Sequence, residues 1–254
     1  MDKKHICTVN ENDRIEGRNP VLEALKSGRE IDKLYIQKGD RGGTLGKIAA
    51  MAKKRGIVIV DADKFKLDKM SVTGAHQGVI ALSAVKEYST VDDILNLAKE
   101  KNEPPFLVIC DEINDPHNLG SVIRTANAAG VHGVIVPKRG SVGLTATVAK
   151  SSAGAVEYTP VAKVTNLAQT IDKLKEKNIW VTGADMNGEN TIYNQDFSGG
   201  IAIVIGSEGY GISRLIKEKC DFLVKIPMFG KITSLNASVA GALMIYEAVR
   251  CRIK

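Results

Sequence analysis

The chain has 254 residues, of which 44% are hydrophobic and 25% are charged, and its formal net charge is +6. This length suits one large domain or two modest ones, and the apolar fraction is sufficient for a buried core. No apolar run approaches the roughly 18 residues that a membrane helix needs, and no apolar segment follows the polar N-terminus, so we expect neither a membrane span nor a signal peptide.

The positive charge is concentrated in the first third of the chain. Residues 1–85 contain 16 Lys and Arg against 11 Asp and Glu, a net charge of +5, whereas residues 86–254 contain 19 against 18, a net charge of +1. Such an excess is compatible with nucleic-acid binding and equally with a solvated surface. The four cysteines are scattered, which favours a cytoplasmic location, and the four histidines lack metal-ligand spacing, so we expect no metal.

The first third of the chain predicts a small α/β domain over residues 13–85, after a flexible tail formed by residues 1–12. Asn19 and Pro20 predict the N-cap and first residue of a helix that ends before Gly28. Strands are expected at 31–37, 57–60 and 78–84, alternating with helices at 44–55 and 63–70. The polar loops 38–43 and 71–78 could be surface turns or contacts to RNA phosphates and 2′-hydroxyls.

The remainder predicts a linker with one helix over residues 86–105, then an α/β domain over 106–254. Its expected strands are 106–110, 133–136, 179–183, 201–205 and 222–226; its expected helices begin near Asn118, as N-cap or close to it, and lie near 142–150 and at 166–177. This pattern indicates a mostly parallel sheet flanked by helices. A final helix is expected to bury one apolar face, formed by Leu235, Val239, Ala242, Leu243, Tyr246 and Val249.

Three segments of this second domain combine glycines with isolated polar residues. They are NLGSVIRTA (residues 118–126), IGSEGYG (205–211) and IPM followed by SLNASVA (226–228 and 234–240). Each has a simple structural interpretation: the glycines could close a turn, Ser234 and Asn236 could be N-caps, and Arg124 could be a surface cation. However, the second and third segments follow strands, and ligands bind at the carboxyl ends of strands in open α/β sheets.

Taken together and in this order, the three segments closely resemble motifs 1, 2 and 3 of the SpoU/TrmH branch of the SPOUT RNA methyltransferases. The resemblance covers about residues 90–252. Residues 13–85, with GRNPV at 17–21 and HQGV at 76–79, look like the L30e-like substrate-binding domain of that family. The two-domain arrangement is most similar to the RlmB-like members, which methylate a guanosine 2′-hydroxyl of 23S ribosomal RNA.

The resemblance implies a C-terminal SPOUT domain with a deep trefoil knot, a rare exception to the rule that chains are unknotted. It also implies a homodimer with active sites at the interface, and S-adenosyl-L-methionine as cofactor. Residues at the motif positions divide into two groups. The cofactor-binding group is Gly206, Ile226 and Leu235, and the catalytic group is Asn118, Arg124, Glu208, Ser234 and Asn236.

The implied reaction is displacement at the sulfonium methyl by a ribose 2′-oxygen, which requires in-line alignment, assisted proton removal and exclusion of water. The resemblance makes Arg124 the activator of the hydroxyl. Because a guanidinium stays protonated, it could instead stabilise the developing alkoxide or bind a neighbouring phosphate. Asn118 would orient that group, while Glu208, Ser234 and Asn236 would position Arg124 and the nucleotide.

Three alternatives stay open. The glycines at 206, 209 and 211 spell G-x-x-G-x-G rather than the dinucleotide-binding G-x-G-x-x-G, which disfavours an oxidoreductase that uses NAD. A non-catalytic RNA-binding protein is disfavoured by the presence of all five catalytic candidates. Transfer RNA remains the alternative to ribosomal RNA as the substrate.

Overall fold

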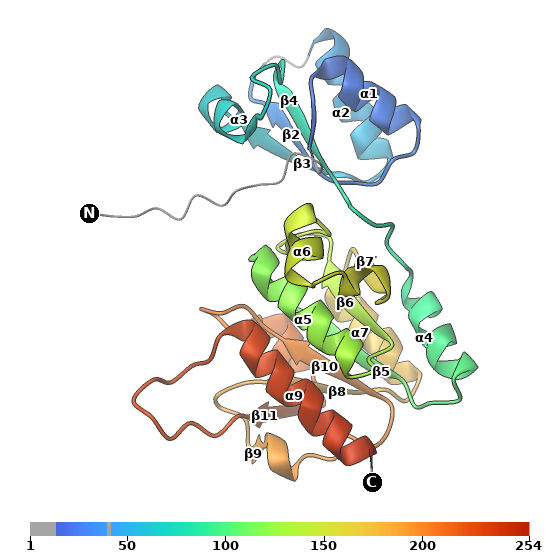
Figure 1. The fold of residues 1–254 in the computed structure, drawn as a ribbon, viewed down its shortest axis with the longest axis vertical. Coiled ribbons are helices and arrows are strands. Elements are labelled where there is room, and N and C mark those ends of the chain that lie inside the picture. The colour runs from blue at the N-terminus through green and yellow to red at the C-terminus, as the bar shows by residue number, and fades with distance from the viewer. Residues whose placement is uncertain (1–13, 40–41, 254) are drawn as a thin grey trace. The chain divides into compact units, whose positions relative to one another are not determined.

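The computed structural model describes residues 14–39 and 42–253. The predicted tail, residues 1–12, and part of the loop 38–43 therefore lie outside the described residues. The chain divides into two compact units (Figure 1). The first consists of the chain up to Glu87 together with Gly143–Thr147, and the second consists of Tyr88–Val142 and of the chain from Val148 onward.

The first unit is built on a four-stranded sheet with the order β1-β4-β2-β3. Strand β4 runs antiparallel to both of its neighbours, whereas β2 and β3 are parallel. Alternate residues of a strand point to opposite faces, so α1 and α2 cover one face and α3 covers the other. The elements are β1 (Arg14–Glu16), α1 (Arg18–Lys26), β2 (Ile31–Gln37), α2 (Gly43–Lys54), β3 (Val58–Ala62), α3 (Lys64–Met70) and β4 (Val79–Ser83).

The start of α1 differs from the sequence prediction. Helix α1 begins at Arg18, and its N-cap is Gly17 with φ 91°, so the prediction of Asn19 as N-cap is wrong. A distant loop replaces the expected cap, because the backbone N–H of Arg18 donates to Gln77 Oε1 at 3.1 Å. Glycine suits the N-cap position because it adopts positive φ without strain.

The second unit contains a seven-stranded sheet with the order β7-β6-β5-β10-β8-β11-β9, and every paired neighbour is parallel. Helices α5 and α9 lie side by side over one face of this sheet (Figure 1). The elements are α4 (Val91–Glu100), β5 (Phe106–Cys110), α5 (Pro116–Ala128), β6 (Gly133–Pro137), α6 (Ala146–Ser151), η2 (Ala155–Glu157), β7 (Val161–Val164), α7 (Leu167–Glu176), β8 (Trp180–Ala184), β9 (Asn190–Thr191), η3 (Ile192–Asn194), β10 (Ile201–Ile205), α8 (Arg214–Lys219), β11 (Phe222–Lys225) and α9 (Ala237–Arg252). Such a sheet presents all its strand ends of one kind at a single edge.

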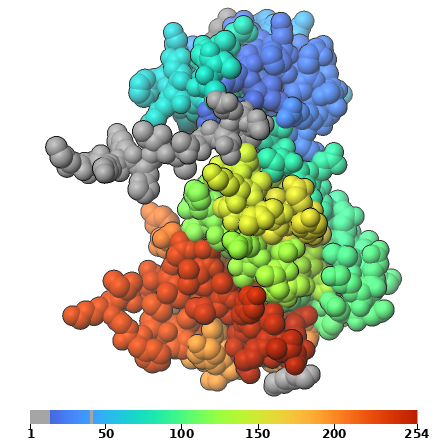
Figure 2. All heavy atoms as spheres, viewed as in Figure 1, coloured from blue at the N-terminus to red at the C-terminus, as the bar shows by residue number. Residues whose placement is uncertain are grey.

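The connection between β11 and α9 projects from the body of the second unit (Figure 2). It carries the part of the third motif that precedes α9, and its residues Phe229 and Ile232 are 97% and 71% exposed. Large apolar side chains that are exposed together on one short segment are typical of a surface that contacts a partner or a ligand.

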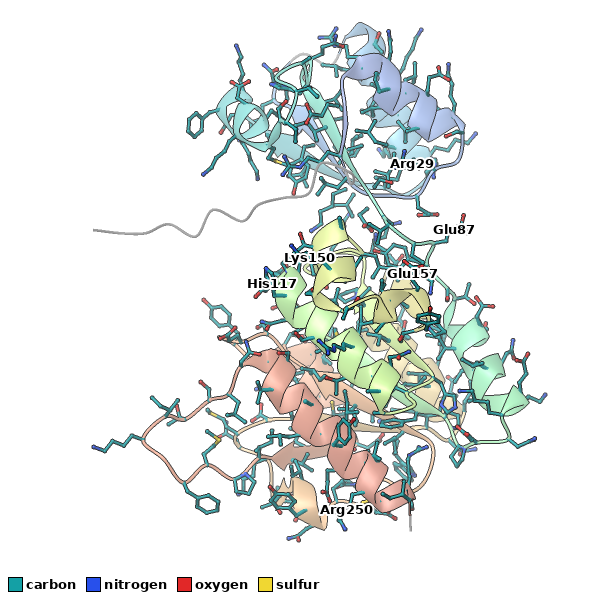
Figure 3. All side chains as sticks on the ribbon, in the orientation of Figure 1. Arg29, Glu87, His117, Lys150, Glu157 and Arg250 are labelled. Carbon is teal, nitrogen blue, oxygen red and sulfur yellow. The ribbon has the colours of Figure 1, made fainter. Side chains whose placement is uncertain are left out.

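Helix α9 buries a different face from the one predicted. Ala237, Gly241, Met244, Ile245 and Ala248 are buried, whereas Val239, Leu243 and Tyr246 of the predicted face are 48%, 41% and 50% exposed. The prediction was wrong because α9 is apolar on both faces, and periodicity cannot tell which of two apolar faces meets the sheet. The buried Glu247 is neutralised one turn later by Arg250, labelled in Figure 3, with 2.6 Å between Oε1 and Nη2.

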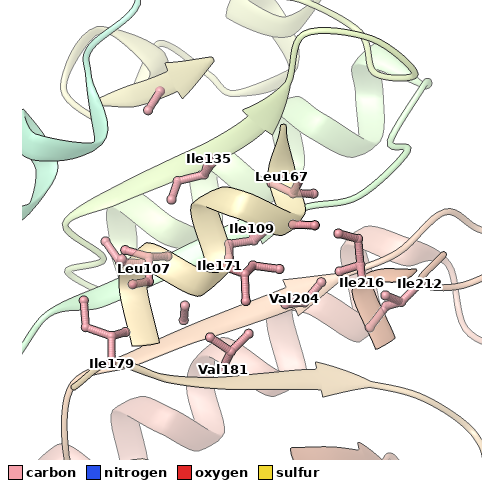
Figure 4. Close-up of a cluster of buried hydrophobic side chains, with 14 of the residues drawn as sticks. Leu107, Ile109, Ile135, Leu167, Ile171, Ile179, Val181, Val204, Ile212 and Ile216 are labelled. Atoms are coloured by element: carbon pink, nitrogen blue, oxygen red, sulfur yellow. The ribbon is translucent and has the colours of Figure 1, made fainter. Parts of the chain in front are cut away.

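The opposite face of the sheet is covered by α4, α7 and α8 around the apolar cluster of Figure 4. Ile94 of α4 is fully buried in this cluster, close against Gly133, where a Cβ would lie 2.5 Å from Ile94. Helix α4 is therefore part of the core of the second unit, although its sequence reads as a polar linker.

The described residues offer neither a membrane span nor a metal site. None of the helices in residues 14–39 and 42–253 has the length and apolar character required to cross a membrane. In the same described ranges, no three His, Cys, Asp or Glu side chains gather as potential metal ligands. Cys110, Cys220 and Cys251 are free thiols, and burial raises the pKa of Cys110 to about 12, so this thiol is unreactive.

Candidate active site

A cavity of about 240 Å³ lies at the carboxyl ends of β8, β10 and β11. These strands are adjacent and parallel, so the chain segments that follow them emerge at one edge of the sheet. The lining includes the segment after β8 (184–187), the segment after β10 (205–211), Ile226 and Met228 after β11, and residues 233–235 before α9. The cavity thus combines the second and third motifs.

The second motif forms a tight hairpin. The backbone N–H groups of Ser207 and Gly211 each donate to the carbonyl oxygen of the other, both at 2.9 Å. Gly211 has φ +66°, and a Cβ on Gly206 would lie 2.1 Å from the carbonyl carbon of Gly211. Gly206 is therefore required for the hairpin to close on itself, which is a structural demand separate from any ligand.

A polar cluster joins the three motifs beside this hairpin. Asn236 Nδ2 donates to Asn118 Oδ1 at 2.9 Å. The amide nitrogens of both asparagines approach Glu208 Oε2 at 3.4 Å. Asn118 is 7% exposed, whereas Glu208 lies on the exposed side of the cluster. Asn118, which is buried, and Asn236, which is partly buried, therefore hold a solvent-facing carboxylate in a fixed direction.

Helix geometry places the two asparagines. Asp115, rather than Asn118, is the N-cap of α5 and accepts from the His117 N–H at 2.9 Å, so Asn118 lies in the first turn with its side chain free for the cluster. Asn236 is the N-cap of α9, and its Oδ1 accepts from the Ser238 N–H at 2.9 Å. The capping interpretation of Asn236 is thus confirmed, and its Nδ2 serves the cluster at the same time.

Arg124 lies apart from the cluster. It is exposed on α5 and has no hydrogen-bonding or ion-pairing partner among residues 14–39 and 42–253. Six residues of α-helix separate it from Asn118, which corresponds to about 9 Å along the axis and a rotation of about 120° around it. The two side chains therefore leave α5 on different faces. Within one chain, the structure brings together Asn118, Glu208 and Asn236, but not Arg124.

The other predicted positions line the cavity. Gly206, Ile226 and Leu235, predicted to bind the cofactor, are all among its lining residues. Ser234 is exposed and also lines the cavity, and it does not cap α9.

Sequence reasoning missed two acidic residues that follow strands. Asp185, after β8, lines the cavity and forms an ion pair with Lys217 of α8. Burial would raise the pKa of Asp185, but hydrogen bonds from Lys217 and from the Asn187 N–H outweigh burial and lower it. Asp111, after β5, accepts from the Ser213 N–H at 2.7 Å and so anchors the exit of the hairpin. The rule that polar residues after strands mark ligand sites would have found both.

Comparison with protein families matches both units. Residues 105–246 match the model of the SpoU rRNA Methylase family, and residues 14–89 match the model of RNA 2′-O ribose methyltransferase substrate binding. The chain belongs to the SpoU rRNA methylase family. The family prediction and the prediction of a SPOUT domain after a smaller substrate-binding domain are therefore confirmed.

Relatives of this family resemble the chain over nearly its whole length. YacO of Bacillus subtilis, named for the TrmH family of tRNA/rRNA methyltransferases, is 52% identical over 242 residues, 95% of this chain and 97% of YacO. A TrmH family protein of Staphylococcus haemolyticus is 50% identical over 94% of this chain and 95% of its own length.

A solved structure shares both the fold and the domain order. AviRb, a SpoU methyltransferase of Streptomyces viridochromogenes crystallised with the cofactor AdoMet, superposes with a TM-score of 0.60 at 25% identity, covering 94% of this chain and 90% of AviRb. AviRb therefore binds AdoMet on a fold that this chain shares.

Proposed function

We propose that this protein transfers a methyl group from S-adenosyl-L-methionine to a ribose 2′-hydroxyl of RNA. The observation that carries the proposal is the hydrogen-bonded cluster of Asn118, Glu208 and Asn236, one residue from each motif, beside a cavity at the carboxyl edge of the sheet. The family match supports the reaction class, and the substrate-binding match over residues 14–89 supports RNA as the partner.

The residues around the cavity suit the proposed cofactor. Ile205, Ile226 and Leu235 supply apolar surface suited to an adenine ring, and Gly206 contributes backbone to the same lining. Asp185 and Lys217 neutralise each other at another wall, so Glu208 is the remaining charged side chain among the lining residues. In this proposal Gly206, Ile226 and Leu235 contact the cofactor, which supplies an electrophilic methyl group when it is bound.

The polar cluster would act on the ribose. Asn118 and Asn236 hold the Glu208 carboxylate, which can accept a hydrogen bond from a sugar hydroxyl and so fix the direction of the 2′-oxygen. Ser234, exposed at the cavity, can donate to the same nucleotide. A cationic guanidinium from Arg124 would stabilise the negative charge that develops on the 2′-oxygen as its proton leaves.

Arg124 can reach such a ribose if the active protein is a homodimer, which we propose. Arg124 is exposed on α5 and the apolar side chains Val239, Leu243 and Tyr246 are exposed on α9, the helix beside it. A second copy that covers this apolar surface could supply its Arg124 to the cavity. We further propose that the third-motif segment threads the trefoil knot of the family. Free cysteines support a cytoplasmic location.

For the substrate we propose a guanosine of 23S ribosomal RNA, with transfer RNA as the second candidate. The family match names ribosomal RNA methylases, whereas YacO is named for both tRNA and rRNA. Mapping 2′-O-methyl groups on total RNA from a strain that lacks the gene decides between them. A lost methyl group in 23S RNA supports the first candidate, and one in tRNA supports the second.

The reaction itself is tested with Arg124→Ala. We expect loss of tritiated-methyl transfer with S-adenosylmethionine affinity within about twofold of wild type, because Arg124 does not line the cavity. The control is Lys173→Ala, which removes an exposed cation from α7 on the opposite face of the sheet and should retain activity. Turnover of the Arg124 variant within a few-fold of wild type would exclude this role.

A further inference from the structure

Tyr210 is an unusual residue within the cavity lining. It is 91% exposed although it belongs to that lining, and the described part of the chain offers it no hydrogen bond or ring contact. Burial of an aromatic ring is a large source of stability, and this ring contributes almost none of it. Its presence on the rim of the cavity is therefore not explained by folding.

The hairpin fixes where Tyr210 lies relative to the polar cluster. The reciprocal hydrogen bonds between Ser207 and Gly211, both 2.9 Å, leave a three-residue tip that carries Glu208 and Tyr210. Glu208 points its carboxylate at the two asparagines. The hairpin thus holds Tyr210 on the same short tip as Glu208, the residue that we propose to orient the ribose.

The neighbours of Tyr210 leave open space around it. At Gly209 and at Gly211, no atom lies within 4 Å of the position that a Cβ would occupy. A second exposed aromatic residue, Phe229, follows Met228, which lines the same cavity. The rim therefore presents uncovered aromatic surface beside the polar cluster.

We infer that Tyr210 is a stacking platform for a nucleobase of the substrate RNA, either that of the methylated nucleotide or that of its neighbour. This inference rests on the function proposed above. A nucleotide that is turned out of a helix can bring its 2′-oxygen into a cavity, and its unstacked base is then stabilised by an aromatic side chain. Stacking accepts any base, so Tyr210 contributes affinity and orientation rather than sequence selection.

The test compares Tyr210→Ala, Tyr210→Phe and a matched control, Tyr158→Ala, in the full-length protein. Tyr158 is 82% exposed but does not line the cavity. The probes are unmethylated 23S RNA transcript and total tRNA from the deletion strain, and the readouts are KM for RNA, kcat and calorimetric affinity for S-adenosylmethionine. We expect Tyr210→Ala to raise KM for RNA roughly ten- to hundredfold, the range given by stacking of one base.

The other measurements separate stacking from other roles. Cofactor affinity should stay within twofold in every variant, Tyr210→Phe should stay within threefold of wild type in KM, and Tyr158→Ala should match wild type. Ultraviolet cross-linking of the RNA, mapped by mass spectrometry, should mark Tyr210 in the wild type. A Tyr210→Ala variant with wild-type KM, or one that loses cofactor affinity instead, overturns the inference while methyl transfer by wild type keeps the proposed function. Absence of methyl transfer to either RNA by wild type refutes both.

Discussion

The side chain of Asn236 has two roles, because it caps α9 and also donates a hydrogen bond to Asn118. Replacement by Ala removes both roles, and replacement by Ser restores only the cap, so the pair of variants separates them. Asn236→Ala removes the N-cap of α9, which costs about 1 kcal/mol. It also leaves Oδ1 of Asn118, a residue only 7% exposed, without its 2.9 Å donor, which costs about 1–3 kcal/mol. The free energy of unfolding should fall by roughly 2–4 kcal/mol, which for a unit of this size lowers the melting temperature on the order of 10 °C.

Asn236→Ser isolates the second task. Serine caps helices about as well as asparagine, so about 1 kcal/mol of stability should return relative to Ala. Its hydroxyl is too short to replace the donor to Asn118, so Glu208 loses its alignment in both variants. Methyl transfer should fall by about a hundredfold in each, the scale expected for a misplaced reacting group.

The assays are urea unfolding and tritiated-methyl transfer, with Asn166→Ala as the control. Asn166 is the N-cap of α7 and accepts from the Gln169 N–H at 3.0 Å, so its loss should cost a similar cap energy without affecting activity. Wild-type activity in Asn236→Ser would refute the reasoning that the cluster orients the substrate. A stability loss below about 0.5 kcal/mol in Asn236→Ala would refute both assigned hydrogen bonds.

Three further changes test other parts of the structure. Gly206→Ala should unfold the hairpin and lower the melting temperature, because the new Cβ would lie 2.1 Å from the carbonyl carbon of Gly211. The control, Gly209→Ala, places its Cβ more than 4 Å from any atom and should keep wild-type stability, so equal melting curves for the two variants would contradict the hairpin geometry. In the first unit, burial raises the pKa of Glu16, but hydrogen bonds from Ser71, Thr73 and the Val72 N–H outweigh this and lower it from 4.5 to about 2. Because the folded pKa is the lower one, this stabilisation is present above about pH 4.5 and is lost as the pH falls towards 2; hydrogen exchange at Val72 should show it, and Glu16→Gln should abolish the pH dependence. Finally, residues 88–254 alone should keep S-adenosylmethionine affinity, because the cavity lies within them, but should bind RNA more weakly. The slope of the logarithm of RNA affinity against the logarithm of salt concentration should become less steep by close to one for each lost phosphate contact, and an unchanged slope would show that the first unit does not contact the RNA backbone.

Periodicity and residue chemistry are enough to determine most of the helices and strands. The strands Phe106–Cys110 and Ile201–Ile205 agree with the sequence prediction to the residue, because each is an apolar run bounded by polar or turn residues. Ile31–Gln37 also agrees to the residue, although it mixes apolar with polar positions. The alternation of strands and helices then determines two α/β units with a mostly parallel sheet in the second. The cap of α9 at Asn236 is readable for the same local reason.

Only the tertiary structure decided which contacts these elements make. Helix α9 is apolar on both faces, so the choice of the face with Met244 and Ile245 depended on the shape of the sheet below it, and the sequence pattern favoured the other face. Helix α1 starts at Arg18 because Gln77, some sixty residues away, accepts from its first N–H. Local sequence carries no information about such a partner.

The site divides in the same way. Residue types and their order in the sequence identified Asn118, Glu208 and Asn236 as candidates. About ninety residues or more separate Asn118 from the other two, so the sequence could not predict that they touch. The parallel strands bring the three segments to one edge of the sheet, and this produces the contact. Arg124 shows the complementary limit. The sequence places Arg124 and Asn118 on one helix, but the rotation of about 100° per residue directs their side chains to different faces. Chemistry at a site depends on the direction of a side chain as well as on its proximity, so the shared helix does not bring Arg124 to the cluster.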